Sequence, residues 1–92
     1  ESYIGKFAKG SYIPHGQGMR AYKDGSWYKG EFYMGKRQGF GEYRDGKNGS
    51  TYLGEWKNDM RHGQGSLTYR FESEYYGYKN KYGTWENDVF KG

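Results

Sequence analysis

Aromatic side chains and glycines alternate in three stretches of the chain. Tyr3-Ile4-Gly5-Lys6-Phe7 recurs as Tyr28-Lys29-Gly30-Glu31-Phe32 and again as Tyr52-Leu53-Gly54-Glu55-Trp56. Successive side chains of a β-strand point to opposite faces, so the tyrosine, the glycine and the second ring of each stretch share one face. The pattern therefore predicts three equivalent strands, each with two rings on either side of a gap.

A pair of glycines follows each of these strands. The pairs lie in Gly16-Gln17-Gly18, Gly39-Phe40-Gly41 and Gly63-Gln64-Gly65, and the first unit has two extra residues around Ser11 to Pro14. Each pair predicts a second strand, so that each unit is a β-hairpin. The turns within the hairpins are expected at Lys9-Gly10, Gly35-Lys36 and Asn58-Asp59. Asp24-Gly25, Asp45-Gly46 and Asn48-Gly49, which tolerate positive φ, predict the turns between units.

The repeat divides the chain into units of about residues 3–27, 28–51 and 52–80, with a partial unit at 81–92. The partial unit begins at Gly83-Thr84-Trp85-Glu86-Asn87-Asp88, which parallels residues 54–59. An alternative register through Tyr75-Tyr76-Gly77 restores a 23-residue spacing. The Gly83 register matches at more positions and is preferred, although residues 70–82 leave both open.

The hairpins are expected to pair edge to edge, because a single two-stranded hairpin is marginal in water. In such a sheet a ring on one strand lies over the glycine of the next and covers its backbone. The sequence therefore predicts an all-β fold in which tandem antiparallel β-hairpins form one elongated, twisted sheet.

Composition supports a folded chain with an aromatic core. Hydrophobic residues make up only 33% of the chain and its mean hydropathy is −1.31, but aromatic residues reach 22%, which disordered segments do not show. The 17 glycines argue against helices. The net charge of +4 is spread along the chain and forms no clustered basic stripe, so a nucleic-acid partner is not expected.

Several classes of function are not indicated by the residues present. No Ser/His/Asp set, phosphate loop or metal-ligand spacing occurs, so we expect neither catalysis nor a cofactor. The absence of Cys is typical of a cytoplasmic protein, and no apolar run reaches the roughly 20 residues of a membrane helix. Because the chain begins at Glu1, we expect it to be a piece of a longer protein.

The repeated rings are the main candidate site. They either form the core or line a groove for a partner, and on a single-layer sheet both roles overlap. These rings are Tyr3, Phe7, Tyr28, Phe32, Tyr52, Trp56 and Trp85.

Two further sets of equivalent residues are assigned structural roles. His15, Gln38 and His62 precede the glycine pairs in equivalent positions, which indicates a role in the turns rather than in metal binding or catalysis. Glu31 and Glu55 are expected on the opposite face of their strands, beside Lys or Arg neighbours.

The units resemble MORN (membrane occupation and recognition nexus) repeats, whose pattern is close to Tyr-x-Gly-x-Trp, a polar turn, Gly-x-Gly and Asp-Gly. Residues 52–65 are a near-complete instance, and the likeness covers 3–69 well and 83–92 in part. The insertion before Pro14 and the irregular 70–82 stretch depart from it. The resemblance implies elongated antiparallel β-structure, protein interaction or scaffolding at membranes or the cytoskeleton, and frequent dimerisation.

Three functions compete at this point. The leading one is a non-catalytic scaffold whose aromatic face binds a partner segment or a second copy of the chain. The second is peripheral binding of anionic phospholipid headgroups by a set of basic residues, namely Lys29, Lys36, Arg37, Lys57 and Arg61. The third is a carbohydrate- or choline-binding repeat, whose modules are also short hairpins rich in Trp, Tyr and Gly.

Overall fold

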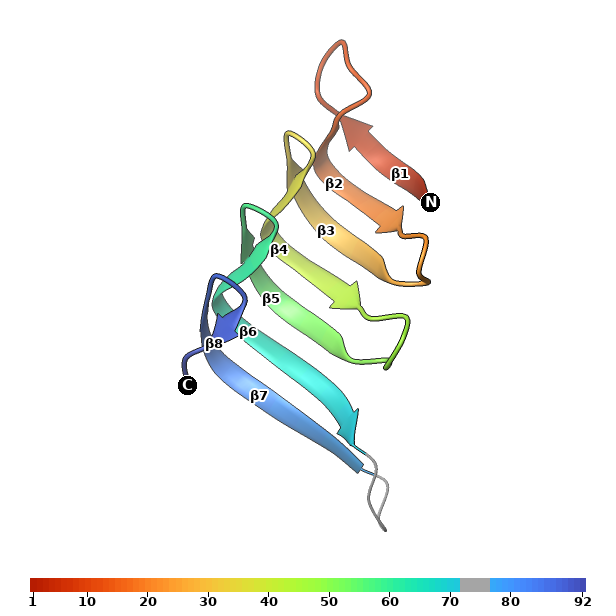
Figure 1. Ribbon diagram of the computed structural model, residues 1–92. Coiled ribbons are helices and arrows are strands. Elements are labelled where there is room, and N and C mark those ends of the chain that lie inside the picture. The colour runs from red at the N-terminus through yellow and green to blue at the C-terminus, as the bar shows by residue number, and fades with distance from the viewer. Residues whose placement is uncertain (72–76) are drawn as a thin grey trace.

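The computed structural model describes residues 1–71 and 77–92, which form one open antiparallel sheet (Figure 1). Its strands pair in chain order, each with the next along the sequence. They are β1 (Ser2–Phe7), β2 (Pro14–Ala21), β3 (Trp27–Tyr33), β4 (Lys36–Arg44), β5 (Thr51–Lys57), β6 (Met60–Phe71), β7 (Gly77–Glu86) and β8 (Val89–Phe90). The all-β prediction is confirmed, and the described residues contain no helix.

The sheet is elongated, with principal extents of 53 × 26 × 15 Å. The turns within hairpins all lie along one side of it, and the connections of residues 22–26 and 45–50 lie along the other (Figure 1). We call the first side the turn edge. This arrangement places equivalent residues of successive units next to one another, as the repeat predicts.

A column of paired glycines crosses the middle of the sheet. The pairing runs through seven strands at Gly5, Gly18, Gly30, Gly41, Gly54, Gly65 and Gly83. Gly83 lies opposite Gly65, which confirms the preferred register. Tyr75 and Tyr76 of the alternative register lie outside the described residues.

Tyrosine rings cover this column, as expected from the sequence. A β-carbon added to Gly18 would collide with the ring of Tyr3, and one added to Gly41 would collide with Tyr28. Gly65 has the same relation to Tyr52. Only glycine leaves room for a ring to lie flat on the neighbouring strand, so the packing explains the glycine content.

A bulge follows the glycine column in each complete hairpin. The register between β3 and β4 shifts between Gly30 and Phe32, and the Glu31 carboxylate accepts the Phe40 amide at 2.7 Å. Glu55 accepts the Gln64 amide at 2.6 Å in the next unit. Both carboxylates thus bind backbone amides, and their expected place beside Lys or Arg neighbours stays a prediction. The bulge leaves such an amide without a partner in the strand pairing, and the carboxylate supplies one.

The turns within hairpins differ in length. Asn58-Asp59 and Asn87-Asp88 have positive φ at both residues, the geometry of a two-residue type I′ turn. The corresponding pair between β3 and β4 is Met34-Gly35, one residue earlier than the Gly35-Lys36 prediction. Residues 8–13 form a longer loop between β1 and β2, where the first unit has its two extra residues.

Candidate functional site

The predicted rings pack as one continuous series on one face of the sheet. Neighbouring centroids are 5.0 to 5.4 Å apart, mostly in edge-to-face contact. The order of the series is Phe7, Tyr3, Phe32, Tyr28, Trp56, Tyr52, Trp85 and Phe90. We call this side of the sheet the aromatic face.

Most of the series is core. Tyr28, Phe32, Tyr52, Trp56 and Trp85 are each at most 5% exposed, whereas Phe7 is 45% exposed. The half-buried side chains that pack against them are Tyr3, Tyr22, Tyr43, Leu67 and Phe90. A partner on this face would therefore touch the half-buried side chains first. The role of the buried rings in partner contact stays a prediction.

Polar groups of the buried rings are satisfied by the backbone. The Tyr28 hydroxyl donates to the Glu31 carbonyl and the Tyr52 hydroxyl to the Glu55 carbonyl, both at 2.8 Å. The Trp56 indole N–H donates to the Gly41 carbonyl at 3.1 Å. Burial raises the pKa of Tyr52 to about 12, and it raises the pKa of Tyr28 further. Both hydroxyls are structural donors at neutral pH.

Arg37 fixes the turn of the following hairpin. Its Nε lies 3.2 Å from Oδ1 of Asp59, its Nη2 donates to the Asp59 carbonyl at 2.9 Å, and its backbone amide donates to the same carboxylate at 2.8 Å. The guanidinium also lies over the Trp56 ring, 4.6 Å from its centroid. The contact between Arg37 and Asp59 thus joins two units, and the guanidinium covers a buried ring.

The same Arg–Asp contact recurs one unit later. Arg61 meets the Asp88 carboxylate with Nε at 3.1 Å and lies 4.6 Å from the Trp85 centroid. The sequence carries a spacing signal for these contacts. Each arginine follows the second aromatic residue of its unit by five positions, and the aspartates follow Trp56 and Trp85 by three.

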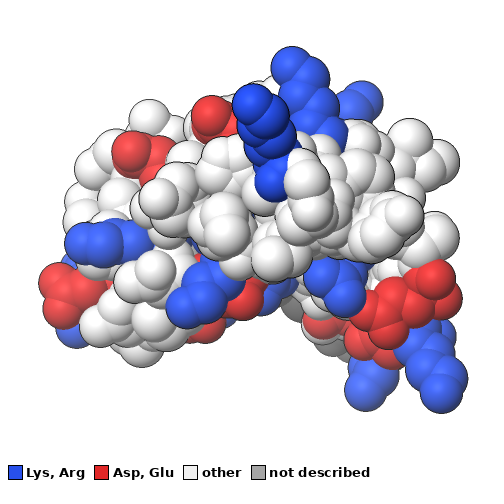
Figure 2. Space-filling model, turned by 90° about the horizontal axis from the view of Figure 1, so that it is seen from above, with Lys and Arg blue, Asp and Glu red and all other residues white. Residues whose placement is uncertain are grey.

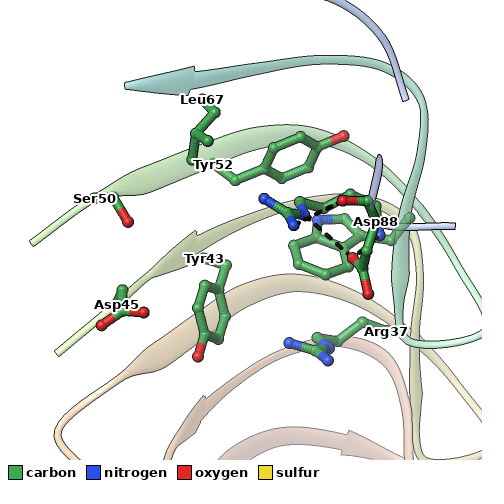
Figure 3. Close-up of a pocket in the computed structure, with 9 residues that line it drawn as sticks. Arg37, Tyr43, Asp45, Ser50, Tyr52, Leu67 and Asp88 are labelled. Carbon is green, nitrogen blue, oxygen red and sulfur yellow. Dashed lines mark hydrogen bonds and ion pairs between the residues drawn. The ribbon is translucent and has the colours of Figure 1, made fainter. Parts of the chain in front are cut away.

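A pocket of about 250 Å³ opens on the aromatic face between these contacts. Figure 3 shows Tyr43 and Tyr52 on neighbouring strands, with Arg37 and Asp88 toward one end and Asp45 and Ser50 toward the other. The lining residues are Arg37, Tyr43, Asp45, Ser50, Tyr52, Trp56, Arg61, Leu67 and Asp88. Tyr43, Asp45 and Ser50 were not among the sequence candidates, because they lie outside the Tyr-x-Gly-x-aromatic pattern.

The basic residues considered for phospholipid binding do not share one surface. Arg37 and Arg61 lie on the aromatic face in ion pairs, whereas exposed Lys29 alternates with buried Tyr28 and Gly30 and so points to the opposite face. Lys36 and Lys57 flank two different turns on the turn edge. Seen from the β1 end, positive and negative side chains are interspersed over the surface (Figure 2).

The residues before the glycine pairs contact the next hairpin turn. His15 accepts the Met34 amide on Nδ1 at 3.1 Å, and Gln38 accepts the Asn58 amide on Oε1 at 3.3 Å. The predicted role of these residues in the turns is confirmed at both positions. The His62 Nδ1 is buried without a hydrogen-bond partner among the described residues.

Residues 1–71 and 77–92 contain neither a candidate metal site nor a candidate membrane-spanning helix. Within them no three His, Cys, Asp or Glu side chains are grouped to hold a metal ion. Nor do these residues form a helix long and apolar enough to cross a membrane.

Comparison with known proteins agrees with the repeat. The MORN repeat family model matches residues 3–27, 28–50 and 52–70. Alsin of Homo sapiens is 36% identical over 72 residues, which span 74% of this chain and 4% of Alsin. MORN repeat-containing protein 3 of Xenopus laevis is 41% identical over 75 residues, or 75% of this chain and 31% of that protein. The chain thus spans a small part of the relatives it matches.

Proposed function

Because this chain belongs to the MORN-repeat family, we propose that it is a non-catalytic protein-interaction module that binds an extended partner segment on its aromatic face. Repeats of this family commonly mediate protein or membrane interactions and are generally not enzymes. The proposal places the module in the cytoplasm, as a scaffold at a membrane or the cytoskeleton. A second copy of the chain is the alternative occupant of the same face.

The observation that carries the proposal is the pocket between the Arg–Asp contacts. The described residues form one layer of strands, so no second layer covers the half-buried Tyr43 and Leu67 at this pocket. Exposed aromatic and aliphatic side chains beside rigid polar groups are typical of protein interfaces. Arg37 and Arg61 are held by their aspartates, which keeps two guanidinium planes in place beside the pocket.

An extended segment suits this surface for a geometric reason. The units repeat along the 53 Å axis of the sheet, and each presents its half-buried side chains to the same face. A strand-like segment rises about 3.3 Å per residue and would meet the side chains of several units in turn. A compact ligand would meet only one.

The test is selection of peptides from a library displayed on phage, with the folded chain immobilised. We expect enriched peptides whose affinity falls at least tenfold in a Tyr43→Ser, Leu67→Ser variant, because these side chains line the pocket and are not buried core. The matched control is Lys29→Ser, Leu53→Ser, where both residues are exposed and alternate with buried residues of the aromatic face. Binding should be measured by titration calorimetry.

Two results would count against the proposal. Peptides that bind the control variant as weakly as the pocket variant do not use the aromatic face. A failure to enrich any peptide, together with a dimer mass that the pocket variant abolishes, assigns the face to a second copy instead. Circular dichroism of both variants checks that the sheet is intact.

A further inference from the structure

The pocket on the aromatic face continues toward β7. A second hollow of about 330 Å³ adjoins it, and both hollows are lined by Ser50 and Leu67. Tyr69 and Lys81 line the far side of the second hollow. Together the two hollows form a groove that crosses the strands from β4 to β7, beside the half-buried Tyr43 and Leu67 (Figure 3). We call it the cross-strand groove.

A row of directly paired residues runs along this groove and ends in a lysine. Strand pairing joins Tyr43 to Tyr52, Tyr52 to Leu67 and Leu67 to Lys81. The residue equivalent to Lys81 in each of the three complete units is a tyrosine, two positions before the glycine of its strand. That tyrosine covers a glycine of the next strand. Because lysine replaces the ring in β7, the row ends there in a cation.

The Lys81 ammonium lies on the aromatic face. Its Nζ is 5.7 Å from the centroid of the Tyr69 ring and 5.9 Å from that of the Phe90 ring. Lys81 is exposed, and within residues 1–71 and 77–92 it is in no ion pair. Two rings therefore position a cation that keeps its capacity to bind a carboxylate.

The opposite end of the groove carries a carboxylate. Asp45 follows β4 and is half-buried in the pocket wall, where its Oδ1 accepts the amides of Lys47 at 2.8 Å and Asn48 at 3.3 Å. These bonds hold the carboxylate in place, and Asp45 forms no ion pair with any residue that the structure describes. Arg37 and Arg61 in the same pocket are instead paired with aspartates. The groove thus has charges of opposite sign, without ion-pair partners, at its two ends.

The spacing of these two charges suits an extended peptide. Neighbouring strands are about 4.8 Å apart, so Asp45 beside β4 and Lys81 in β7 are separated by on the order of 15 Å. Four residues of an extended segment span about 13 Å, and every second side chain faces the same way. A segment along the groove can therefore place a first side chain near Asp45 and a third near Lys81. The second then lies over Tyr52, between the half-buried Tyr43 and Leu67.

We infer that the cross-strand groove selects extended protein segments with a basic, an apolar and an acidic side chain at alternate positions. The basic side chain pairs with Asp45 and the acidic one with Lys81, while the apolar side chain fills the pocket between them. A uniformly acidic or uniformly basic segment is repelled at one end of the groove, and repulsion of this kind gives specificity. The inference rests on the proposed function and adds the chemistry of the partner.

The test is selection from a phage library of random peptides on the native chain and, in parallel, on Lys81→Glu and Asp45→Asn variants. Peptides selected on the native chain should carry a basic and an acidic residue on opposite sides of an apolar residue, each two positions from it. On the Lys81→Glu chain a basic residue should replace the acidic one. Asp45→Asn keeps the Oδ1 that accepts the two loop amides, and selection on it should lose only the preference for the basic residue.

Synthetic peptides give the size of the effect. Lys81→Glu should weaken binding of the tightest peptide selected on the native chain at least tenfold in titration calorimetry. Exchanging the acidic residue of that peptide for lysine should restore most of the affinity for this variant. Both effects should shrink as salt is raised, because Lys81 is exposed and its charge is screened.

Lys57→Glu is the matched control. It reverses the charge of an exposed lysine that alternates with buried Trp56 and so points away from the aromatic face. This variant should bind the peptide as the native chain does. Circular dichroism of each variant checks that the sheet is intact.

Two results overturn the inference and leave the proposed function standing. The first is a set of peptides that bind the native chain but show no charge preference around the apolar residue. The second is a loss of affinity from Lys57→Glu as large as that from Lys81→Glu. If no peptide is enriched on the native chain, the proposed function fails and the inference fails with it.

Discussion

The junction between the first and second units differs from the two junctions that follow it. At the later junctions an arginine holds an aspartate of the next turn and covers a tryptophan whose N–H is bonded to a glycine carbonyl. At the first junction Pro14, Gly35 and Phe32 occupy the positions of arginine, aspartate and tryptophan. What remains there is one backbone hydrogen bond from Gly35 to Pro14 and the His15 contact.

The difference separates two layers of stabilisation. Rings over glycines are common to all three complete hairpins and define the fold, because Tyr3 covers Gly18 as Tyr28 covers Gly41. Among the described residues, the Arg–Asp contacts between turns are present only at the two later junctions, where they fix the relative position of the turns. The stability of a repeat protein depends on the interfaces between neighbouring units. We therefore expect the β1 end to open more readily than the middle of the array.

The largest expected effect comes from removing a ring in the middle of the array. Trp56→Ala should lower the free energy of unfolding by about 3–5 kcal/mol, because it empties a buried site, removes an indole hydrogen bond and uncovers Arg37. Phe7→Ala, at the exposed end of the same series, should cost about 1 kcal/mol or less. Urea denaturation followed by circular dichroism measures both. Similar losses of unfolding free energy in the two variants would show that ring packing stabilises the ends of the array as much as its middle.

The sequence predicted the common layer and missed the contacts specific to the later junctions. The Tyr-x-Gly-x-aromatic pattern has a period of two, so it indicates strands, a shared face and the glycine column directly. Arg37 and Asp59 are 22 residues apart, and the contact depends on how one hairpin stacks on the next. The same limit applies to the pocket, because Tyr43 and Leu67 differ in type and so do not look like one repeated position.

The extent of ring burial was also beyond the sequence. A single layer leaves one face open, so the sequence left both a core role and an accessible role for the rings, and edge-to-face packing of rings from successive strands buries Tyr28 and Tyr52 almost completely.

The position of the Met34-Gly35 turn was likewise beyond the sequence. Several residues near position 35 tolerate a turn, so the sequence does not decide between Met34-Gly35 and Gly35-Lys36. The observed turn places the Gly35 amide on the Pro14 carbonyl and the Met34 amide on His15.

The second expected effect is a loss of stability at alkaline pH. Below pH 10 Tyr52 is protonated in both the folded and the unfolded chain. As the pH rises from 10 to about 12, the unfolded chain releases this proton while the folded chain retains it, so the free energy of unfolding falls. Urea denaturation at successive pH values should show the decline, and Tyr52→Phe should reduce it.

The tyrosine at the first junction provides the comparison. Burial raises the pKa of Tyr3 also, but its side chain is only half-buried, and we expect Tyr3→Phe to change the alkaline decline less than Tyr52→Phe does. Ultraviolet absorbance of the tyrosinates, recorded for the native chain and for each variant, measures the contribution of each ring to the ionisation. If both variants leave the decline unchanged, other groups cause it.

A smaller effect is expected from the Arg–Asp contact itself. Arg61→Met keeps an apolar stem over Trp85 but removes the ion pair with Asp88, the bond to its carbonyl and the cation over the ring. Exposed ion pairs and cation–π contacts each contribute about 1 kcal/mol or less, so the loss should be about 1–2 kcal/mol. Urea denaturation in low and high salt measures it, and part of the loss should disappear when salt screens the charges.

Building the missing contact at the first junction is the converse experiment. Pro14→Arg with Gly35→Asp supplies the guanidinium, the carboxylate and the backbone amide that Arg37 and Asp59 use, and φ of 68° at Asp59 shows that aspartate accepts this turn geometry. We expect the pair to stabilise the β1 end by up to about 1 kcal/mol and to slow hydrogen exchange of β1 amides. Each single change should give no gain, since neither creates the contact alone. A double variant no more protected than the native chain would mean that ring packing, and not the contact between turns, sets the stability of each junction.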